Sequence, residues 1–144
     1  MNTLQLSSKR LLSLLLAVTM LFGVLTFTAC NKEPVVIKDS DTCIVINVPE
    51  SAEEMTLIDY METLKADGTL DFTLQSGMVT SIGDIENTAD FSQCWMLYTS
   101  DADNANSAWG TVEYDGNEYG SAVVGAEALT IKPGCLYIWV YMSF

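Results

Sequence analysis

One stretch of helical spacing constrains the fold more than any other feature of this sequence. Its apolar residues recur at intervals of three and four, as on the buried side of a helix: Leu57, Ile58, Met61 and Leu64. Thr56 with Asp59 resembles a capping box before this stretch, and Gly68 suits the position after its last turn. We therefore expect one helix here, and one helix can cover only one face of a sheet.

Most of the other apolar segments alternate with polar residues, as strands do. Short strands are expected within the segments 43–48, 70–75, 78–85, 94–100, 109–120 and 134–144. Ser76-Gly77 marks a turn between two of them, and Asp115-Gly116 is a strong hairpin signal. A polar loop is expected over Asp101–Ala108. One helix and about six short strands together predict an α+β fold, in which a sheet formed by these strands covers the helix.

The last strand has two different faces, because successive side chains of a strand point to opposite sides of the sheet. One face carries Leu136, Ile138, Val140 and Met142, and the other carries Tyr137, Trp139 and Tyr141. We expect the helix to cover the aliphatic face, which Ile44, Ile46 and Val48 would extend on the neighbouring strand. The aromatic face would then be covered only in part, by loops.

The first 29 residues have the order of a secretory signal. Lys9 and Arg10 precede the apolar run 11–27, and Ala29 then stands directly before Cys30. This order is similar to a bacterial lipoprotein signal, in which the chain is cut before a cysteine that carries the lipid. An uncleaved anchor is the alternative, because 17 apolar residues are near the lower limit for spanning a bilayer. The expected division is a signal peptide at 1–29, a lipidated cysteine and flexible tether at 30–41, and one folded domain at 42–144.

The charge of the chain excludes several classes of partner. With the signal removed, four basic and nineteen acidic residues remain, a net charge of −15. Nucleic acid and anionic lipid headgroups need basic surfaces, so neither is an expected partner. The sequence has no histidine, which removes the commonest general base and the commonest transition-metal ligand. Because no nucleophile is paired with a base, we expect a protein that is not an enzyme and holds no metal.

Aromatic residues are the main binding candidates, because flat rings bury large areas and stack on other rings and on sugars. The candidates are Trp109, Tyr137, Tyr141, Trp95, Tyr98 and Trp139. Trp95 heads an apolar strand, where packing is the more frequent role, and Trp139 is expected to be mostly buried beneath loops. Trp109 follows the polar loop, and we expect it to line a ligand site with accessible edges of Tyr137 and Tyr141.

The order of elements and several short motifs resemble a known family. "VTSIG" at 79–83, Trp95 and "KPG" at 132–134 are similar to the C-terminal domain of transcobalamin and intrinsic factor. The resemblance covers 42–144 and implies a β-grasp, a mixed sheet that grips one helix. In that fold the first and last strands are adjacent and parallel. A corrinoid is the ligand that the resemblance implies, bound by this domain alone or together with another chain.

The same implied topology would bring two cysteines together. If the first and last strands are parallel neighbours, Cys43 and Cys135 both begin strands at the same end of the sheet. We expect them to form a disulfide and Cys94 to stay free, with Cys94–Cys135 as the alternative pairing. Disulfides persist in the oxidising compartment that a secretory signal implies.

The leading functional hypothesis is a binding module that is anchored by lipid on the outer side of the cytoplasmic membrane. It would capture a small molecule with a ring-shaped surface, a cobalamin-type ligand being the named example, and hand it to a transporter. The alternative is an adhesion or assembly module that docks a protein or a cell-wall glycan through the aromatic face. An envelope enzyme is a weaker third hypothesis. A concave pocket would favour the first hypothesis, and a flat apolar patch the second.

Replacing the expected lipidation site tests the anchor. We expect Cys30→Ser to release the protein from the membrane fraction or to block its maturation, because a serine cannot carry the thioether-linked lipid. Cell fractionation followed by mass measurement of the mature N-terminus checks this. Unchanged fractionation together with normal signal cleavage would contradict it.

Overall fold

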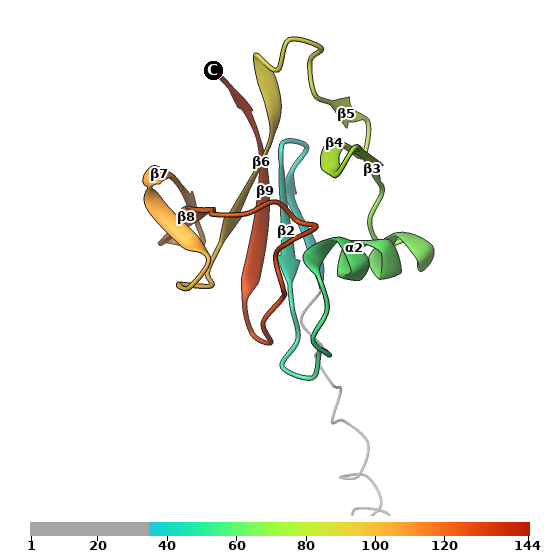
Figure 1. Ribbon diagram of the computed structural model, residues 1–144, viewed down its shortest axis with the longest axis vertical. Helices are drawn as coiled ribbons and strands as arrows, with labels where there is room; N and C mark the ends of the chain where they lie inside the picture. Colours follow the sequence, from blue (N-terminus) through green and yellow to red (C-terminus); the bar gives the residue numbers. More distant parts are fainter. Residues whose placement is uncertain (1–34) are drawn as a thin grey trace, which may run out of the picture. The chain divides into compact units, whose positions relative to one another are not determined.

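The computed structural model describes residues 35–144, which form nine strands and one helix (Figure 1). The larger sheet has six strands in the spatial order β1 (Val36–Ser40), β2 (Cys43–Asn47), β9 (Leu136–Ser143), β6 (Gln93–Thr99), β8 (Asn117–Ala122) and β7 (Ala105–Tyr114). The smaller sheet consists of β3 (Phe72–Gln75), β4 (Met78–Ile82) and β5 (Ile85–Glu86). The helix, α2 (Leu57–Ala66), follows β2 in the chain. The expected α+β class is confirmed.

Every pairing between neighbouring strands in the described residues is antiparallel. β9 lies beside β2, so the expected contact between these two segments is confirmed, but their expected parallel direction is wrong and the sheet is not mixed. In the β2–β9 ladder Cys43 lies opposite Val140, and Asn47 lies opposite Leu136. An antiparallel ladder thus sets the start of β2 against the end of β9.

An edge strand lies where a tether was expected. β1 pairs with β2, with Val36 opposite Ile46 and Lys38 opposite Ile44. The folded domain therefore begins before Thr42, and the expected boundary at residue 42 is wrong. The segment is short, and its second half is charged and exposed, so its composition resembles a linker more than a strand.

The helix forms as its sequence predicts. Thr56 is the N-cap, and its Oγ1 accepts a hydrogen bond from the backbone N–H of Asp59 at 3.1 Å. After the last turn Gly68 adopts a φ of 78°, and the N–H of Thr69 donates to the carbonyl of Leu64 at 2.9 Å. The expected four apolar residues of α2 are its buried ones: Leu57, Ile58, Met61 and Leu64.

The two faces of the larger sheet are the reverse of those expected. Residues directly opposite each other in a ladder point to the same face, and Ile44 lies opposite Trp139. The aromatic residues of β9 therefore share a face with Ile44 and Ile46, and this is the face that packs against α2 in the main core. The aliphatic residues of β9 point to the opposite face. The expectation that the helix covers the aliphatic face is wrong.

The aliphatic face is covered by the sheet itself. Val45, Tyr98 and Ile138 are buried there, and half-buried side chains from both edges of the sheet pack against them. Ile37 comes from β1 at one edge, and Tyr114 comes from β7 at the other. Side chains from the two edge strands therefore cover the buried residues of this face. Figure 1 shows the β7–β8 hairpin turning away from the plane of β2 and β9 on the side opposite α2.

Both turns expected from glycine pairs are present. Ser76 and Gly77 have φ values of 51° and 81°, and Asp115 and Gly116 have values of 49° and 72°. These positive values are the type I′ geometry that joins twisted antiparallel strands. The expected polar loop is shorter than predicted, because β7 already begins at Ala105.

The signal and lipidation expectations fall outside the described residues. Residues 1–29 and Cys30 precede residue 35, where the description begins. Within residues 35–144, no helix has the length and apolar character needed to cross a bilayer.

Truncating a buried helix residue tests the packing of α2 on the aromatic face. Leu64 is 5% exposed, and we expect Leu64→Ala to lower the free energy of unfolding by about 2–5 kcal/mol because it leaves a cavity. Glu62→Ala, on the exposed side of the same helix, is the matched control and should change stability by less than about 0.5 kcal/mol. Chemical denaturation measures both, and equal effects would mean that this helix face is not buried.

Candidate functional site

The structure separates the six aromatic candidates instead of gathering them. Trp95, Tyr137, Trp139 and Tyr141 lie on the helix-covered face, Tyr98 lies on the opposite face, and Trp109 lies on the edge strand β7. Tyr137 is fully buried, so its expected accessible edge is wrong. Trp109 is 64% exposed, as expected. Trp139 is buried as expected, but it belongs to the core that packs against the helix, so its expected cover by loops is wrong. No cleft walled by Trp109, Tyr137 and Tyr141 is present in the described residues.

Most polar atoms of the buried rings are tied to other elements. Trp95 Nε1 donates to the carbonyl of Ile85 at 2.9 Å, and Tyr141 Oη donates to the carbonyl of Glu86 at 2.7 Å. These two bonds hold β5 against the larger sheet, and the Trp95 and Tyr141 ring centroids lie 5.4 Å apart. Tyr137 Oη accepts from the N–H of Lys132 at 2.9 Å. The aromatic face is therefore a hydrogen-bonded core.

The leading candidate site is a pocket of about 320 Å³ at the margin of this core. We call it the edge pocket. Val36, Lys38, Asp41 and Ile44 line it from β1, β2 and their turn, and the segments 69–71 and 82–85 line it from the end of the helix, β4 and β5. Its volume is at the small end of the range for sites that bind small molecules.

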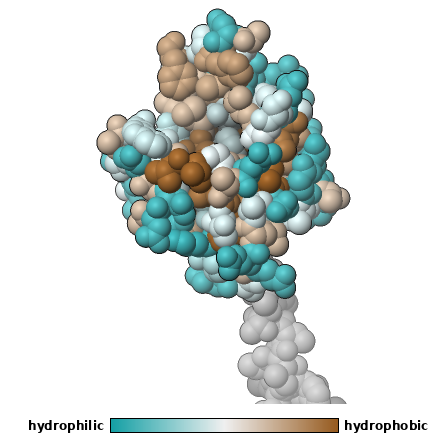
Figure 2. Space-filling view, viewed as in Figure 1, coloured by the Kyte–Doolittle hydropathy of each residue, from teal (hydrophilic) through white to brown (hydrophobic). Residues whose placement is uncertain are grey.

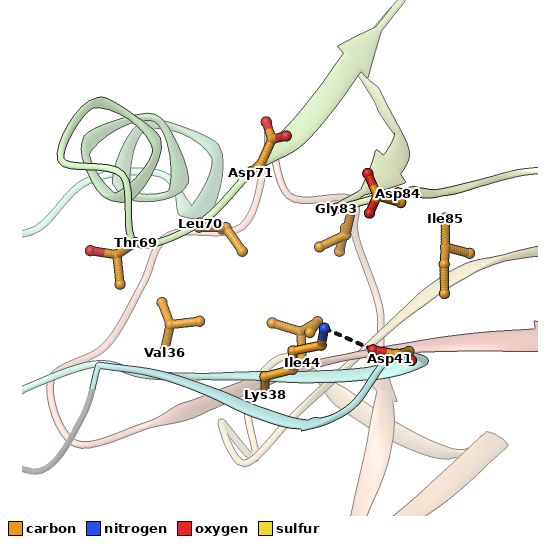
Figure 3. A pocket seen from close by; sticks show the side chains of 11 residues that line it. Val36, Lys38, Asp41, Ile44, Thr69, Leu70, Asp71, Gly83, Asp84 and Ile85 are labelled. Atoms are coloured by element: carbon orange, nitrogen blue, oxygen red, sulfur yellow. Dashed lines mark ion pairs between the residues drawn. The ribbon is translucent and has the colours of Figure 1, made fainter.

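The inside of the edge pocket is apolar and its rim is charged. Figure 3 shows the side chains of Val36, Leu70 and Ile85 turned toward the cavity. The carboxylates of Asp71 and Asp84 stand at its edge. Such a site would hold the apolar body of a ligand inside and leave the polar end of that ligand at the mouth.

The charges at the mouth do not balance. Lys38 Nζ lies 2.7 Å from Asp41 Oδ1, and both side chains are exposed. This hydrogen bond and the attraction between the two charges raise the pKa of Lys38 and lower the pKa of Asp41. Asp71 and Asp84 line the same mouth, and within residues 35–144 neither forms an ion pair, although the charge of Asp84 also acts on Lys38. The rim therefore carries more negative than positive charge, and a cation is favoured there.

Local turns bring the walls of the edge pocket together. Gly83 has a φ of 56°, which favours glycine, and its N–H donates to the carbonyl of Asp71 at 2.8 Å. This bond fixes the β4–β5 turn beside the segment that follows the helix. The sequence contained the signals for the helix end and for β4, but none of these residues was recognised as a site. The run of three β-branched residues Val35, Val36 and Ile37 was the one signal that could have indicated β1.

The cysteines do not pair. Cys43, Cys94 and Cys135 are all free thiols. Cys135 precedes β9, which begins opposite the end of β2, so Cys43 and Cys135 lie at opposite ends of this ladder. The predicted disulfide is wrong because it depended on parallel strands. The alternative fails for the same reason, since Cys94 lies opposite Met142 at the far end of β9.

The acidic segment after β6 has a structural role. Asp101 is 3% exposed, and its Oδ1 accepts a hydrogen bond from Lys132 Nζ at 2.7 Å. Lys132 also lies 2.6 Å from Asp103, which is exposed. Burial opposes ionisation of Asp101, but hydrogen bonds from Lys132, from Asn104 and from the Asp103 amide hold its pKa below the ordinary value. The pair fixes the turn that leads into β9.

The described residues hold no group of three or more His, Cys, Asp or Glu side chains that is arranged to bind a metal ion. Comparison of the chain with family models, with curated proteins and with solved structures finds no match. The site is therefore argued from its own geometry.

Removing the buried carboxylate tests its role in the turn before β9. We expect Asp101→Asn to lower the free energy of unfolding by about 1–3 kcal/mol, because it weakens charge-assisted hydrogen bonds at a buried group. Asp103→Asn, which removes the exposed partner of the same lysine, should cost about 0–1 kcal/mol.

The pH dependence follows from the direction of the pKa shift. The folded-state pKa of Asp101 lies below its unfolded value of about 3.9, so the ionised group stabilises the fold above that pH. This stabilisation is lost as the pH falls through the folded-state pKa. Denaturation at a series of pH values should show the difference between wild type and Asp101→Asn shrinking below about pH 4. A difference that is constant across this range would contradict the assignment.

Proposed function

We propose that this domain is a non-catalytic binding module for a small molecule and that the edge pocket is its binding site. The observation that supports this most is an apolar cavity with a charged mouth, built where three separate parts of the chain meet. Ligand sites are concave and mostly apolar, and they carry a few polar groups that orient the ligand. The edge pocket has these properties, whereas the aromatic face is filled by core packing.

The proposed ligand has an apolar body and a cationic or hydroxyl-bearing end. The body fits beside Val36, Ile44 and Leu70. The end lies at the rim, where Asp71 and Asp84 attract positive charge and accept hydrogen bonds. The acidic composition of the whole chain adds to this attraction, because its formal net charge is −13.

A lipid anchor and a place outside the cytoplasm belong to the same proposal. They are supported by the junction between Ala29 and Cys30. A ligand held at the membrane surface in this way could be passed to a transporter. The resemblance of "VTSIG" and "KPG" to the transcobalamin C-terminal domain keeps a corrinoid among the candidates, although the antiparallel pairing of β2 with β9 differs from the β-grasp that it implies. A macrocycle is larger than the edge pocket, so only a peripheral group of it would enter.

Docking to a protein or cell-wall glycan is the second candidate function. It is favoured by Trp109, which is 64% exposed on the edge strand β7. An exposed indole offers a flat surface for a sugar ring. Retention of glycan binding by a Trp109→Ala variant would remove this candidate.

Three probes of matched shape test the edge pocket. We expect benzylammonium in excess to raise the melting temperature, benzyl alcohol to raise it less, and benzoate to have no effect, because ligand binding to the folded state stabilises it. Cyanocobalamin, tested in the same series, examines the corrinoid candidate. Equal shifts with all three charge types, or no shift with any of them, would contradict a site with a negatively charged rim.

Two variants and a control show whether the rise in melting temperature with benzylammonium comes from binding in the edge pocket. Val36→Phe fills the cavity and should abolish the benzylammonium shift, whereas Asp84→Asn should reduce it. Asp115→Asn makes the same charge change in the β7–β8 hairpin, whose residues do not line the pocket, and should leave the shift unchanged. An effect of Asp115→Asn as large as that of Asp84→Asn would mean that the general charge of the protein, rather than the edge pocket, attracts the probe.

A further inference from the structure

The smaller sheet carries a row of polar side chains on its outer face. Residues directly opposite each other in a ladder point to the same face, and Ser81 lies opposite Thr73 of β3 and opposite Glu86 of β5. The other face of this sheet belongs to the main core, to which it contributes the buried Phe72 and Ile82. The polar row therefore lies on the side of the smaller sheet that is turned away from the core.

A bulge in β4 adds a second hydroxyl beside this row. Thr73 lies opposite Ser81, and Leu74 lies opposite Val79, so Thr80 is an extra residue of β4 with no opposite number in β3. A bulge sets two successive residues against one residue of the partner strand and re-aims a side chain. Thr80 and Ser81 consequently line the same hollow, although neighbours in a regular strand point to opposite faces.

This hollow is a groove of about 430 Å³, which we call the polar groove. Its volume lies in the range of sites that bind small molecules, and it shares no described lining residue with the edge pocket. Among the described residues that line it, Glu86 is the one that is charged. Six others carry a hydroxyl or an amide: Thr73, Gln75, Thr80, Ser81, Asn87 and Thr88.

Side-chain hydrogen bonds fix the wall of the groove that follows β5. Asn87 Nδ2 donates to the carbonyl of Val79 at 3.1 Å, and Asn87 Oδ1 accepts from the N–H of Trp95 at 2.9 Å. Thr88 Oγ1 accepts from the N–H of Gln93 at 2.9 Å. These bonds tie the wall to β4 and β6, so the groove exists before a ligand arrives, and binding needs little ordering of the protein.

Ser81 is a buried residue of the groove whose hydroxyl has no partner. It is 6% exposed, and its Oγ forms no hydrogen bond within residues 35–144. The Oγ is nevertheless reached by water, because Trp139 Nε1 is the one unpaired polar side-chain atom of the described core residues that is sealed from solvent. Buried hydroxyls are usually paired. The fold thus leaves a group that can both donate and accept where a ligand in the groove would lie.

Phe91 places an aromatic ring beside these polar groups. Its φ is 53°, which a bulky residue seldom adopts, and its side chain is 49% exposed. The turn holds it there, because the N–H of Phe91 donates to the carbonyl of Thr88 at 3.0 Å and Asp90 Oδ1 accepts from the N–H of Ser92 at 3.1 Å. Neither backbone preference nor core packing explains a phenylalanine at this position, and such outliers gather at ligand sites.

A lone ring among hydroxyls and amides suits a sugar better than a protein surface. On the face of the domain that Figure 2 shows, apolar side chains reach the surface in separate groups that are bordered by hydrophilic ones. Protein docking needs a larger continuous apolar patch. A pyranose ring instead has hydroxyls around its edge and C–H groups on its two faces, so it can use Ser81 and the Phe91 ring at the same time.

The single carboxylate of the groove narrows the charge of the ligand. Glu86 is exposed, and its carboxylate can accept hydrogen bonds from sugar hydroxyls. It repels an anion, as does the net charge of the whole chain. One carboxylate exposed to water adds little affinity for a cation. The chemistry of the groove therefore selects an uncharged sugar.

We propose that the polar groove binds an uncharged sugar, with Ser81 Oγ hydrogen-bonded to a sugar hydroxyl and the Phe91 ring against a C–H face of the sugar. The site is separate from the edge pocket, and it does not include Trp109 on β7. It is therefore independent of both functions proposed above.

Uncharged and anionic glycosides test the groove on the full-length, ¹⁵N-labelled chain. The uncharged probes are methyl β-D-glucopyranoside, methyl β-D-galactopyranoside and methyl N-acetyl-β-D-glucosaminide, and the anionic probe is methyl β-D-glucuronide. We expect at least one uncharged probe to move the assigned amide signals of Ser81 and Phe91 in a saturable way, and the glucuronide to cause no shift. No saturable shift with any uncharged probe, or an equal shift with the glucuronide, would overturn the proposal.

Matched variants locate the bound sugar. Ser81→Ala removes the hydroxyl without adding bulk and should weaken the affinity for the sugar roughly three- to tenfold. Ser121→Ala makes the same change at a residue of β8 that is 5% exposed, and it should leave the affinity unchanged. Phe91→Leu keeps an apolar side chain but removes the flat ring, so it should also weaken binding, whereas Phe144→Leu at the exposed end of the chain should not.

A third site separates this groove from docking on β7. Trp109→Ala should leave the affinity for the sugar unchanged. Loss of binding with Trp109→Ala, together with full binding by Ser81→Ala and Phe91→Leu, would place the sugar on β7 and overturn the proposal. If Ser81→Ala does not fold, Phe91→Leu still decides, because the ring of Phe91 is half exposed in a turn.

Discussion

The antiparallel ladder between β2 and β9 determines most of what this domain can do. Because Ile44 lies opposite Trp139, and Ile46 opposite Tyr137, the aromatic side of the last strand joins the aliphatic side of β2 against the helix. A parallel ladder would have paired the ends of these strands differently and brought Cys43 to Cys135. One choice of strand direction thus decides which rings are buried, which cysteines stay free and where cavities are left.

Because the aromatic face is buried, its residues have a structural role. Tyr137, Tyr141 and Trp95 use their polar atoms to fix the turn before β9 and the short strand β5. Their rings are the rigid centre on which the peripheral walls rest, and not a platform for a ligand. The edge pocket lies at the margin of this centre, where the helix end, β1 and the smaller sheet leave a gap.

The edge pocket brings apolar and charged groups together within one small domain. It combines an apolar interior with exposed carboxylates, so the ligand that we propose for it is a cation with an apolar body. The pocket also depends on the aromatic core, because Trp95 and Tyr141 hold β5, whose Ile85 lines it.

The sequence by itself determined the local elements. Thr56, the apolar stripe of α2, Gly68 and the two glycine turns carry their own conformational preferences, which act over a few residues and are therefore visible in a single chain. The sequence also showed that β9 has two unlike faces. Only the tertiary structure decided which face meets the helix, because the direction of β9 relative to β2 depends on contacts between residues about ninety positions apart. For the same reason the sequence could not reveal which strand β1 pairs with, how the edge strands cover Val45 and Ile138, or the edge pocket, since each is made by segments that local patterns do not connect.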